Sequence, residues 1–198
     1  MFYDMTRLHG PALMLVDIQK GFGDIDYWGG QRNNPDAERR CGELLGLWRE
    51  RGLPVCHIQH CSTVLVSPLH ASNAGNAFQD IVAPRVGEVV FRKQVNSAFI
   101  GTDLQAWLVR AGIRKLIIAG LTTDHCISTT ARMSGNLGFE TLIVADATAT
   151  FNKTGVDGQH YSAELIHDTA LASLSQEFAR IVTSEWITRE MANTQSLI

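Results

Sequence analysis

The chain has 198 residues, of which 45% are hydrophobic and 19% charged, with a formal net charge of −3 and a sequence pI near 6.1. This composition is typical of a soluble globular protein and excludes the basic balance that binds nucleic acid or an anionic membrane surface. The length suits one α/β domain and is short for two, so we expect a single domain over 1–198.

The sequence predicts a cytoplasmic protein. No apolar run approaches the ~20 residues that span a bilayer, and residues 1–10 lack the basic segment and apolar core of a secretory signal. Disulfides are not expected in that compartment, so each cysteine is expected to be a packing residue, a ligand or a reagent. The cysteines are Cys41, Cys56, Cys61 and Cys126.

In chain order, apolar runs rich in β-branched residues alternate with longer stretches of helical periodicity. The expected strands are 12–18, 54–60, 88–93, 115–120, 141–146 and 180–184. The expected helices are 36–52, 102–112, 124–136 and 160–177, followed by a terminal turn at 186–192. Apolar strands separated by helices indicate a sheet with helices on both faces. With right-handed crossovers this predicts an α/β fold, a doubly wound, mostly parallel six-stranded sheet of Rossmann-like type.

Reactive side chains gather at the carboxyl ends of these strands, where open α/β sheets bind ligands. Asp17 ends the first strand, His60 the second and Lys93 the third, and Cys126 lies just beyond the fourth. A carboxylate, an ammonium and a thiol are therefore expected at the same rim of the sheet. This combination favours a cysteine nucleophile served by an acid–base group and a cation.

The segment GLTTDHCISTTAR (120–132) places Cys126 in the first turn of an expected helix. The helix dipole and a nearby lysine predict a lowered pKa for this thiol, and the free N–H groups of the turn could bind an oxyanion. The alternative is a core thiol, because free cysteine is among the most buried residue types.

Four segments resemble the isochorismatase-like cysteine hydrolases, a superfamily that includes nicotinamidases and N-carbamoylsarcosine amidohydrolase. They are LMLVDIQKGF, FRKQVNSAFIGTDL, LIIAGLTTDHCISTTAR and LGFETLIVADATATF. The resemblance implies that Asp17 takes the proton of the Cys126 thiol, that Lys93 holds both groups, and that Cys126 attacks a carbonyl. It also implies a cis peptide between Leu121 and Thr122, an oxyanion hole formed by the N–H groups of Thr122 and Cys126, and a homodimer or higher homo-oligomer.

The segment VCHIQHC (55–61) raises the question of a metal site. Its cysteines and histidines alternate between the two faces of a strand and lack the C-x-x-C spacing of structural zinc. Nicotinamidases of the superfamily bind a metal through an Asp-x-His pair at about this place, where this chain reads His60-Cys61-Ser62, and His70 alone is a weak ligand. The first strand is also not followed by the G-x-G-x-x-G turn of dinucleotide-binding proteins. We expect no metal and no cofactor.

Several side chains around the rim are candidates for contact with a small-molecule substrate: Phe22, Trp28, His60, Asn96, Phe99 and His125. For Trp28, a capped core or an oligomer contact is an equal alternative. The irregular segments 19–35 and 61–87 border this rim, and long loops of this kind are often functional. Asp146 ends the fifth strand and is expected to cap a loop.

Together these features predict a metal-independent cysteine hydrolase that cleaves a C–N bond in a small amide, carbamoyl or ureido substrate through a thioester. One alternative is an isochorismate-type vinyl-ether hydrolase, which uses the carboxylate as an acid and does not need the thiol. The other is a non-catalytic thiol redox or ligand-binding protein on the same scaffold. The segment DIQKGF lacks the Asn-Asp-Phe ending common in isochorismatases and nicotinamidases, and the sequence does not identify the substrate.

Overall fold

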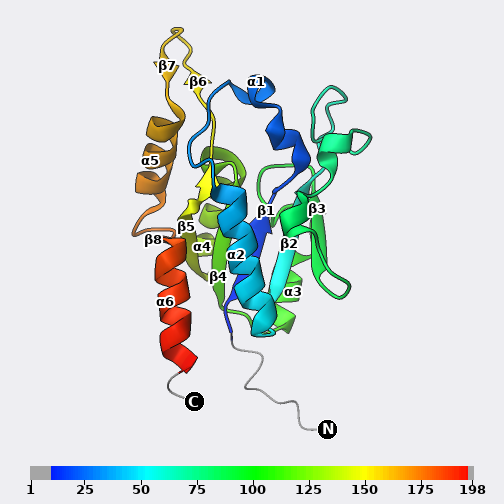
Figure 1. Cartoon of the computed structure of the whole chain (residues 1–198), viewed down its shortest axis with the longest axis vertical. Helices are drawn as coiled ribbons and strands as arrows, with labels where there is room; N and C mark the ends of the chain where they lie inside the picture. The colour runs from blue at the N-terminus through cyan, green and yellow to red at the C-terminus, as the bar shows by residue number, and fades with distance from the viewer. Residues whose placement is uncertain (1–9, 196–198) are drawn as a thin grey trace.

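A computed structural model describes residues 10–195 (Figure 1). Its main sheet has six strands, all parallel, in the order β3-β2-β1-β4-β5-β8. The strands are β1 (Ala12–Val16), β2 (Val55–His60), β3 (Val89–Lys93), β4 (Lys115–Leu121), β5 (Glu140–Ala149) and β8 (Arg180–Val182). This is the strand order of the doubly wound fold, and it confirms the predicted architecture.

Helices cover both faces of the sheet. One face is covered by α2 (Ala37–Glu50) and α6 (Ser184–Gln195). The other is covered by α3 (Leu104–Arg110), α4 (Ser128–Asn136) and α5 (Ala163–Leu174). Shorter elements are α1 (Ile25–Trp28), a π-helical turn (Thr123–Ile127), three 3₁₀ turns (Lys20–Gly23, Ala74–Asn76, Asp80–Val82) and the hairpin β6 (Lys153–Thr154)–β7 (His160–Tyr161). No helix in this part of the chain is long and apolar enough to cross a bilayer.

The central strand β1 is buried on both faces. Ala12, Met14 and Val16 pack into the hydrophobic cluster under α3, α4 and α5. Leu13 and Leu15 alternate with them and pack into the cluster under α2. Burial of apolar area is the main favourable term in folding, so this strand fixes the middle of the molecule. The residue that follows it therefore emerges at the centre of the carboxyl-end rim.

Strand β1 ends at Val16, two residues earlier than predicted. Asp17 has a φ of 53°, in the left-handed region, so the backbone leaves the strand direction there. Nearby, Gly120 in β4 has a φ of 128°, and a Cβ at this position would lie 2.0 Å from the Val16 carbonyl oxygen. Only glycine therefore allows β4 to approach β1 this closely beside the rim.

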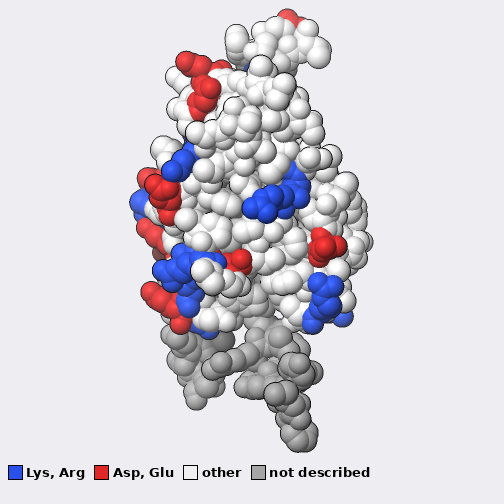
Figure 2. Space-filling view, turned by 90° about the vertical axis from the view of Figure 1, so that its right-hand side faces the viewer, with Lys and Arg blue, Asp and Glu red and all other residues white. Residues whose placement is uncertain are grey.

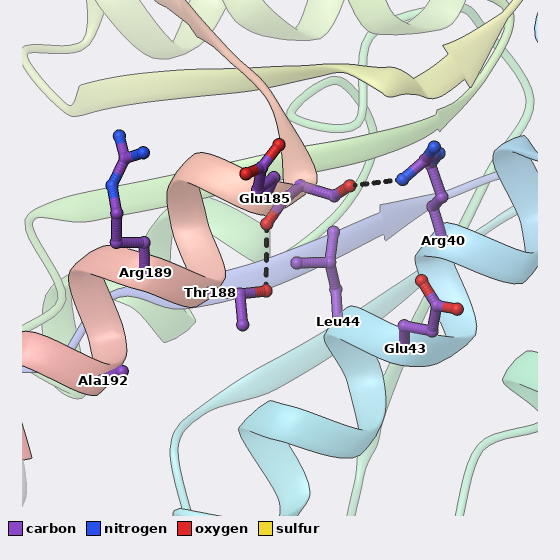
Figure 3. A pocket seen from close by; sticks show the side chains of 8 residues that line it. Arg40, Glu43, Leu44, Glu185, Thr188, Arg189 and Ala192 are labelled. Atoms are coloured by element: carbon purple, nitrogen blue, oxygen red, sulfur yellow. Dashed lines mark hydrogen bonds between the residues drawn. The ribbon is translucent and has the colours of Figure 1, made fainter.

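Helix α6 corrects the expectation of a short terminal turn at 186–192. It begins at Ser184, whose N–H and Oγ both donate to the Asp146 carboxylate, at 2.8 and 2.7 Å. Arg40 of α2 also bonds Ser184 Oγ, at 2.9 Å (Figure 3). The open groove that Figure 3 shows between α2 and α6 contains none of the predicted catalytic side chains. Asp146 thus has the structural capping role expected from the sequence.

The helix expected at 160–177 is shorter in the structure, where α5 spans Ala163–Leu174 and follows the β6–β7 hairpin. Ser162 caps α5 by accepting a hydrogen bond from the Leu165 N–H. On the side of the molecule that Figure 2 shows, lysines and arginines are interspersed with acidic residues. That face presents no continuous basic stripe of the kind that follows a nucleic-acid backbone.

Glu88 joins α2 to the edge of the sheet. Its carboxylate accepts hydrogen bonds from Arg49 Nε at 2.7 Å and from the Arg85 N–H at 2.8 Å, and it contacts His57 Nε2 at 2.9 Å. The hydrogen bond from Arg49 is the main cause that lowers the pKa of Glu88 to about 2. A carboxylate with a lowered folded pKa stabilises the fold above its unfolded pKa, and that contribution is lost as the pH falls through the folded pKa.

We expect Glu88→Gln to lower the free energy of unfolding at pH 7 by about 2 kcal/mol, since charge-assisted hydrogen bonds are lost. The difference from wild type should shrink as the pH falls below 4.5, the ordinary pKa of a glutamate, toward the pKa of about 2 that Glu88 has in the folded protein. Urea unfolding at pH 7, 5 and 3.5 measures this. Glu140→Gln breaks an exposed ion pair with Lys115 and should cost less than about 1 kcal/mol. Equal effects of the two variants would contradict the prediction.

Candidate active site

The predicted catalytic side chains meet at the carboxyl end of the sheet. Lys93, the last residue of β3, donates from Nζ to Asp17 Oδ2 at 2.6 Å and to Cys126 Sγ at 3.2 Å. Asp17 and Lys93 have exposed fractions of 0% and 1%, and Cys126 of 8%. The tertiary structure thus brings together three groups that lie up to 109 residues apart (126 − 17) in the chain.

Asp17 has one carboxylate oxygen free for chemistry. Oδ2 accepts from Lys93, whereas Oδ1 is buried and has no hydrogen-bond partner among the described residues. The backbone carrying it is held by a hydrogen bond from the Asp17 N–H to the Ile58 carbonyl at 3.0 Å. Unsatisfied buried acceptors and left-handed non-glycine residues are unfavourable and concentrate at functional sites. Oδ1 is therefore suited to take a proton.

Cys126 lies in a π-helical turn, Thr123–Ile127, that leads directly into α4. Turns of this type are rare and are frequent at functional sites. The preceding peptide, between Leu121 and Thr122, is cis, as the family resemblance implied. The Thr122 carbonyl accepts from the N–H groups of His125 and Ile127 at 3.2 and 3.1 Å.

Side chains from α5 and from the segment after β5 anchor this turn. Thr123 Oγ1 contacts Nδ1 of His167, on α5, at 2.9 Å. Asp124 accepts a short hydrogen bond from Thr150 Oγ1. These contacts fix the turn, and with it the thiol, at the rim.

The prediction that the Cys126 thiol has a lowered pKa is wrong for the site without substrate. Burial raises the pKa of this thiol, and the Asp17 carboxylate raises it further, while Lys93 only partly opposes them. Helix-end position and a lysine neighbour are therefore outweighed by desolvation. The resting nucleophile is a thiol, and an adjacent base must remove its proton before attack.

Lys93 is the charged partner of this site. Burial works to lower the pKa of Lys93, but the charges and hydrogen bonds of Asp17 and Cys126 outweigh it and raise the pKa. The side chain is thus a permanently charged ammonium at neutral pH. A buried ammonium is tolerable only where acceptors surround it.

Two of the predicted substrate-contacting residues lie beside these three. The ring of His60, at the end of β2, has Nδ1 3.0 Å from Lys93 Nζ. Asn96 is exposed, and its Oδ1 lies 3.9 Å from Cys126 Sγ. Both are therefore placed to meet a molecule that reaches the thiol.

Phe22 and Trp28 form part of an aromatic cluster next to the rim. Their ring centroids are 4.6 Å apart, and both rings lie 6.2 Å from that of Phe151. The same cluster contains Leu121, so it backs the loop that carries Thr122. Phe22 is buried and Trp28 is half-buried, with Nε1 donating to the Gly21 carbonyl at 2.9 Å. Packing in this cluster is enough to explain the burial of Phe22. Part of the Trp28 ring remains exposed and could contact a substrate.

Among the described residues, Phe99 and His125 make no side-chain hydrogen bond or ion pair with the three predicted catalytic residues. Phe99 stacks on Phe139 at 5.9 Å and packs against the core, so burial explains it without a substrate contact. The His125 side chain is 55% exposed, with Nε2 3.4 Å from Asp124. Their assignment as substrate-binding residues remains a sequence prediction.

Sequence reasoning missed Gln19 and Asn76. Gln19 is buried, donates to the carbonyls of His60 and Asn76 at 3.0 and 2.7 Å, and accepts from the His60 N–H at 2.9 Å. Asn76 also donates to the His60 carbonyl, at 2.9 Å. The available signal was a glutamine two residues after Asp17 in a buried segment, where a polar group needs a specific partner.

The described residues include one group of three potential metal-binding side chains: Asp17, His60 and Cys126, whose donor atoms lie within 4.8 Å of one another. A thiolate and an imidazole suit soft or borderline divalent cations. However, the Lys93 ammonium lies within 3.2 Å of atoms from all three, so a metal would have to displace this cation. His70 does not belong to the group and bonds Ser72 instead.

Comparisons with known proteins identify the family of the chain. The Isochorismatase domain family matches residues 11–186. The chain is 45% identical over 183 residues to the isochorismatase family protein YrdC of Bacillus subtilis, covering 92% of this chain and 97% of the relative. It is also similar to the maleamate amidohydrolase of Pseudomonas putida, at 27% identity over 88% of this chain and 84% of that protein.

A solved structure supports the same relationship. The crystal structure of an isochorismatase-family protein from Chromobacterium violaceum aligns with a TM-score of 0.88 at 43% identity. The alignment covers 92% of this chain and 94% of the crystallised one. The sheet order and helix arrangement described above are therefore those of an experimentally determined fold.

Removing Lys93 should leave the Asp17 carboxylate buried without a counter-charge. We expect Lys93→Met to destabilise the protein by about 3–5 kcal/mol. The double variant Asp17→Asn, Lys93→Met should be destabilised by less than the sum of the two single variants, because neither charge remains. Urea unfolding of the four proteins measures this coupling. Simple additivity would show that the two groups do not interact in the folded protein.

Proposed function

The chain belongs to the isochorismatase family of hydrolases, and from this we propose that it hydrolyses a C–N bond in a small amide, carbamoyl or ureido compound. The proposed intermediate is a thioester on Cys126. The observation that carries the proposal is the buried ammonium of Lys93, which bridges the Asp17 carboxylate and the Cys126 thiol at 2.6 and 3.2 Å.

In the first half-reaction, Asp17 Oδ1 removes the thiol proton as Sγ attacks the substrate carbonyl carbon. The Lys93 ammonium stabilises the sulfur anion that develops, so charge separation occurs beside a fixed cation. The tetrahedral intermediate collapses when the C–N bond breaks and protonated Asp17 gives its proton to the leaving nitrogen. This step releases the amine and leaves the acyl group on sulfur.

In the second half-reaction, Asp17 takes a proton from water and the hydroxide attacks the thioester carbonyl. The C–S bond breaks, the sulfur regains a proton from Asp17, and the acid leaves. Asp17 thus serves as base and acid in turn, and the Lys93 ammonium offsets the negative charge that moves between Asp17 and Cys126. The sum is one water consumed for each C–N bond broken.

The oxyanion of each tetrahedral intermediate needs hydrogen-bond donors. In this proposal the backbone N–H groups of Thr122 and Cys126 supply them. Support comes from the π-helical turn around Cys126, which side-chain contacts from His167 and Thr150 anchor at the rim. Fixed backbone donors in a site from which water is excluded are effective because they need no reorganisation during the reaction.

Amide cleavage is favoured over the two alternatives by the position and state of the thiol. A vinyl-ether hydrolase has no use for a sulfur held against a buried ammonium, and one relative, the maleamate amidohydrolase, is named as an amide hydrolase. A redox sensor needs an accessible thiol of low pKa, whereas burial raises the pKa of Cys126.

Cys126→Ala should abolish turnover of whichever carbamoyl, ureido or carboxamide compound the wild type hydrolyses. Asp17→Asn should reduce the rate by about 10²- to 10⁴-fold, because it removes the general base and acid. Both are measured by screening a panel of such compounds for release of ammonia or amine. Cys41→Ser changes a cysteine on α2 that bonds the Ala147 carbonyl, away from the site, and is the matched control.

Intact-mass spectrometry during turnover separates amide from vinyl-ether chemistry. An acyl adduct on wild type that maps to Cys126 supports the thioester route. Full turnover by Cys126→Ala would refute covalent catalysis, and turnover of a vinyl ether without an adduct would favour the carboxylate acting as an acid.

A further inference from the structure

Several hydrogen bonds with the side chains of Gln19 and Asn76 fix the backbone of His60 at the end of β2. Its N–H donates to Gln19 Oε1, and its carbonyl accepts from Gln19 Nε2 and from Asn76 Nδ2, at 2.9–3.0 Å. Gln19 itself is fully buried. These bonds hold the backbone of His60, from which the imidazole ring reaches Lys93 Nζ.

This ring completes the surroundings of the Lys93 ammonium. An ammonium has three N–H donors, and Nζ has three acceptors: Asp17 Oδ2 at 2.6 Å, His60 Nδ1 at 3.0 Å and Cys126 Sγ at 3.2 Å. The number of acceptors therefore equals the number of N–H donors, and the three acceptors are a carboxylate, an imidazole and a thiol. Loss of one acceptor would leave a buried N–H unsatisfied or let the ammonium turn away from sulfur.

The contact also defines the tautomer of His60. Nδ1 receives a hydrogen bond from an ammonium, so it must present its lone pair, and the proton of the neutral ring is then on Nε2. Nε2 has no hydrogen bond to any described residue and is not among the buried unsatisfied atoms. Its N–H is consequently open to solvent on the side of the ring away from Lys93.

We propose that His60 is a positioning residue with two separable functions: Nδ1 orients the Lys93 ammonium toward Cys126 Sγ, and Nε2–H donates a hydrogen bond to an acceptor atom of the substrate. This inference rests on the proposed hydrolase function and deepens it. It assigns to the substrate a hydrogen-bond acceptor, such as a carbonyl oxygen, on the His60 side of the thiol.

The first function requires a neutral imidazole, because an imidazolium cannot accept from Lys93. The groups facing the ring are Lys93 on β3, Asp17 after β1 and Cys126 in the π-helical turn. Burial and then the Lys93 charge lower the pKa of His60 from 6.5, and Asp17 partly opposes them. The ring is thus neutral at pH 7, and the Lys93 contact is lost only when the pH falls below 6.5.

Two amide substitutions separate the functions. His60→Asn places an oxygen near the Nδ1 position and removes the outer donor, whereas His60→Gln places its amide near the Nε2 position and loses the inner acceptor. With an amide that the wild type hydrolyses, we expect His60→Gln to reduce kcat at least about tenfold with little change in KM. His60→Asn should retain kcat and raise KM about fivefold or more.

Iodoacetamide provides a readout that needs no substrate. Its rate of reaction with Cys126, followed by peptide mass spectrometry, reports the stabilisation of the thiolate by Lys93. At pH 7 we expect the His60→Asn rate to stay within about twofold of wild type and the His60→Gln rate to fall about tenfold. Below pH 6.5 the wild-type rate should fall more steeply than that of His60→Asn, which has no titratable group at this position.

Cys56, which is fully buried on β2, must remain unlabelled in every protein, so its labelling would reveal unfolding. Equal alkylation by wild type and His60→Gln at pH 7, with Cys56 protected, would overturn the first function. An unchanged KM in His60→Asn would overturn the second. If Cys126→Ala is inactive while both His60 variants behave as wild type, only the role of His60 fails and the proposed hydrolysis stands.

Discussion

The site depends on one buried cation. The Lys93 ammonium is almost fully removed from water, which is unfavourable unless acceptors replace the lost hydration. Asp17, His60 and Cys126 provide these acceptors from three different segments. Because the ammonium requires all of them at hydrogen-bonding distance, the same contact that makes its burial tolerable also assembles a base, a nucleophile and a positioning ring.

The fold delivers these groups through its strand order. Parallel strands β3, β2, β1 and β4 lie side by side, so residues at their carboxyl ends share one rim. Close approach at that rim is possible because Gly120 has no side chain to strike the Val16 carbonyl. Gln19 and Asn76 then fix the end of β2, and contacts from α5 and from Thr150, just after β5, fix the turn of Cys126.

The electrostatics fit a nucleophile that is generated during the reaction. Burial and Asp17 keep the resting sulfur protonated, while the free Oδ1 of Asp17 is available to accept its proton. A buried, protonated thiol suits the proposed hydrolase better than a redox sensor, because oxidation of cysteine favours an accessible thiolate. The Lys93 charge, already in place, then stabilises the thiolate as it forms.

Apolar periodicity in the sequence predicted the alternating strands and helices, and general topology rules for such alternation then predicted the doubly wound sheet and the meeting of Asp17, Lys93 and Cys126 at one rim. Sequence reasoning failed for α6, whose first turn depends on Asp146, 38 residues away, and for the thiol pKa, which depends on desolvation. The sequence held no signal for the contact between His60 Nδ1 and Lys93 Nζ, nor for the hydrogen bond of the His60 N–H to Gln19. Burial and hydrogen bonding between distant segments leave no periodic signal in the chain.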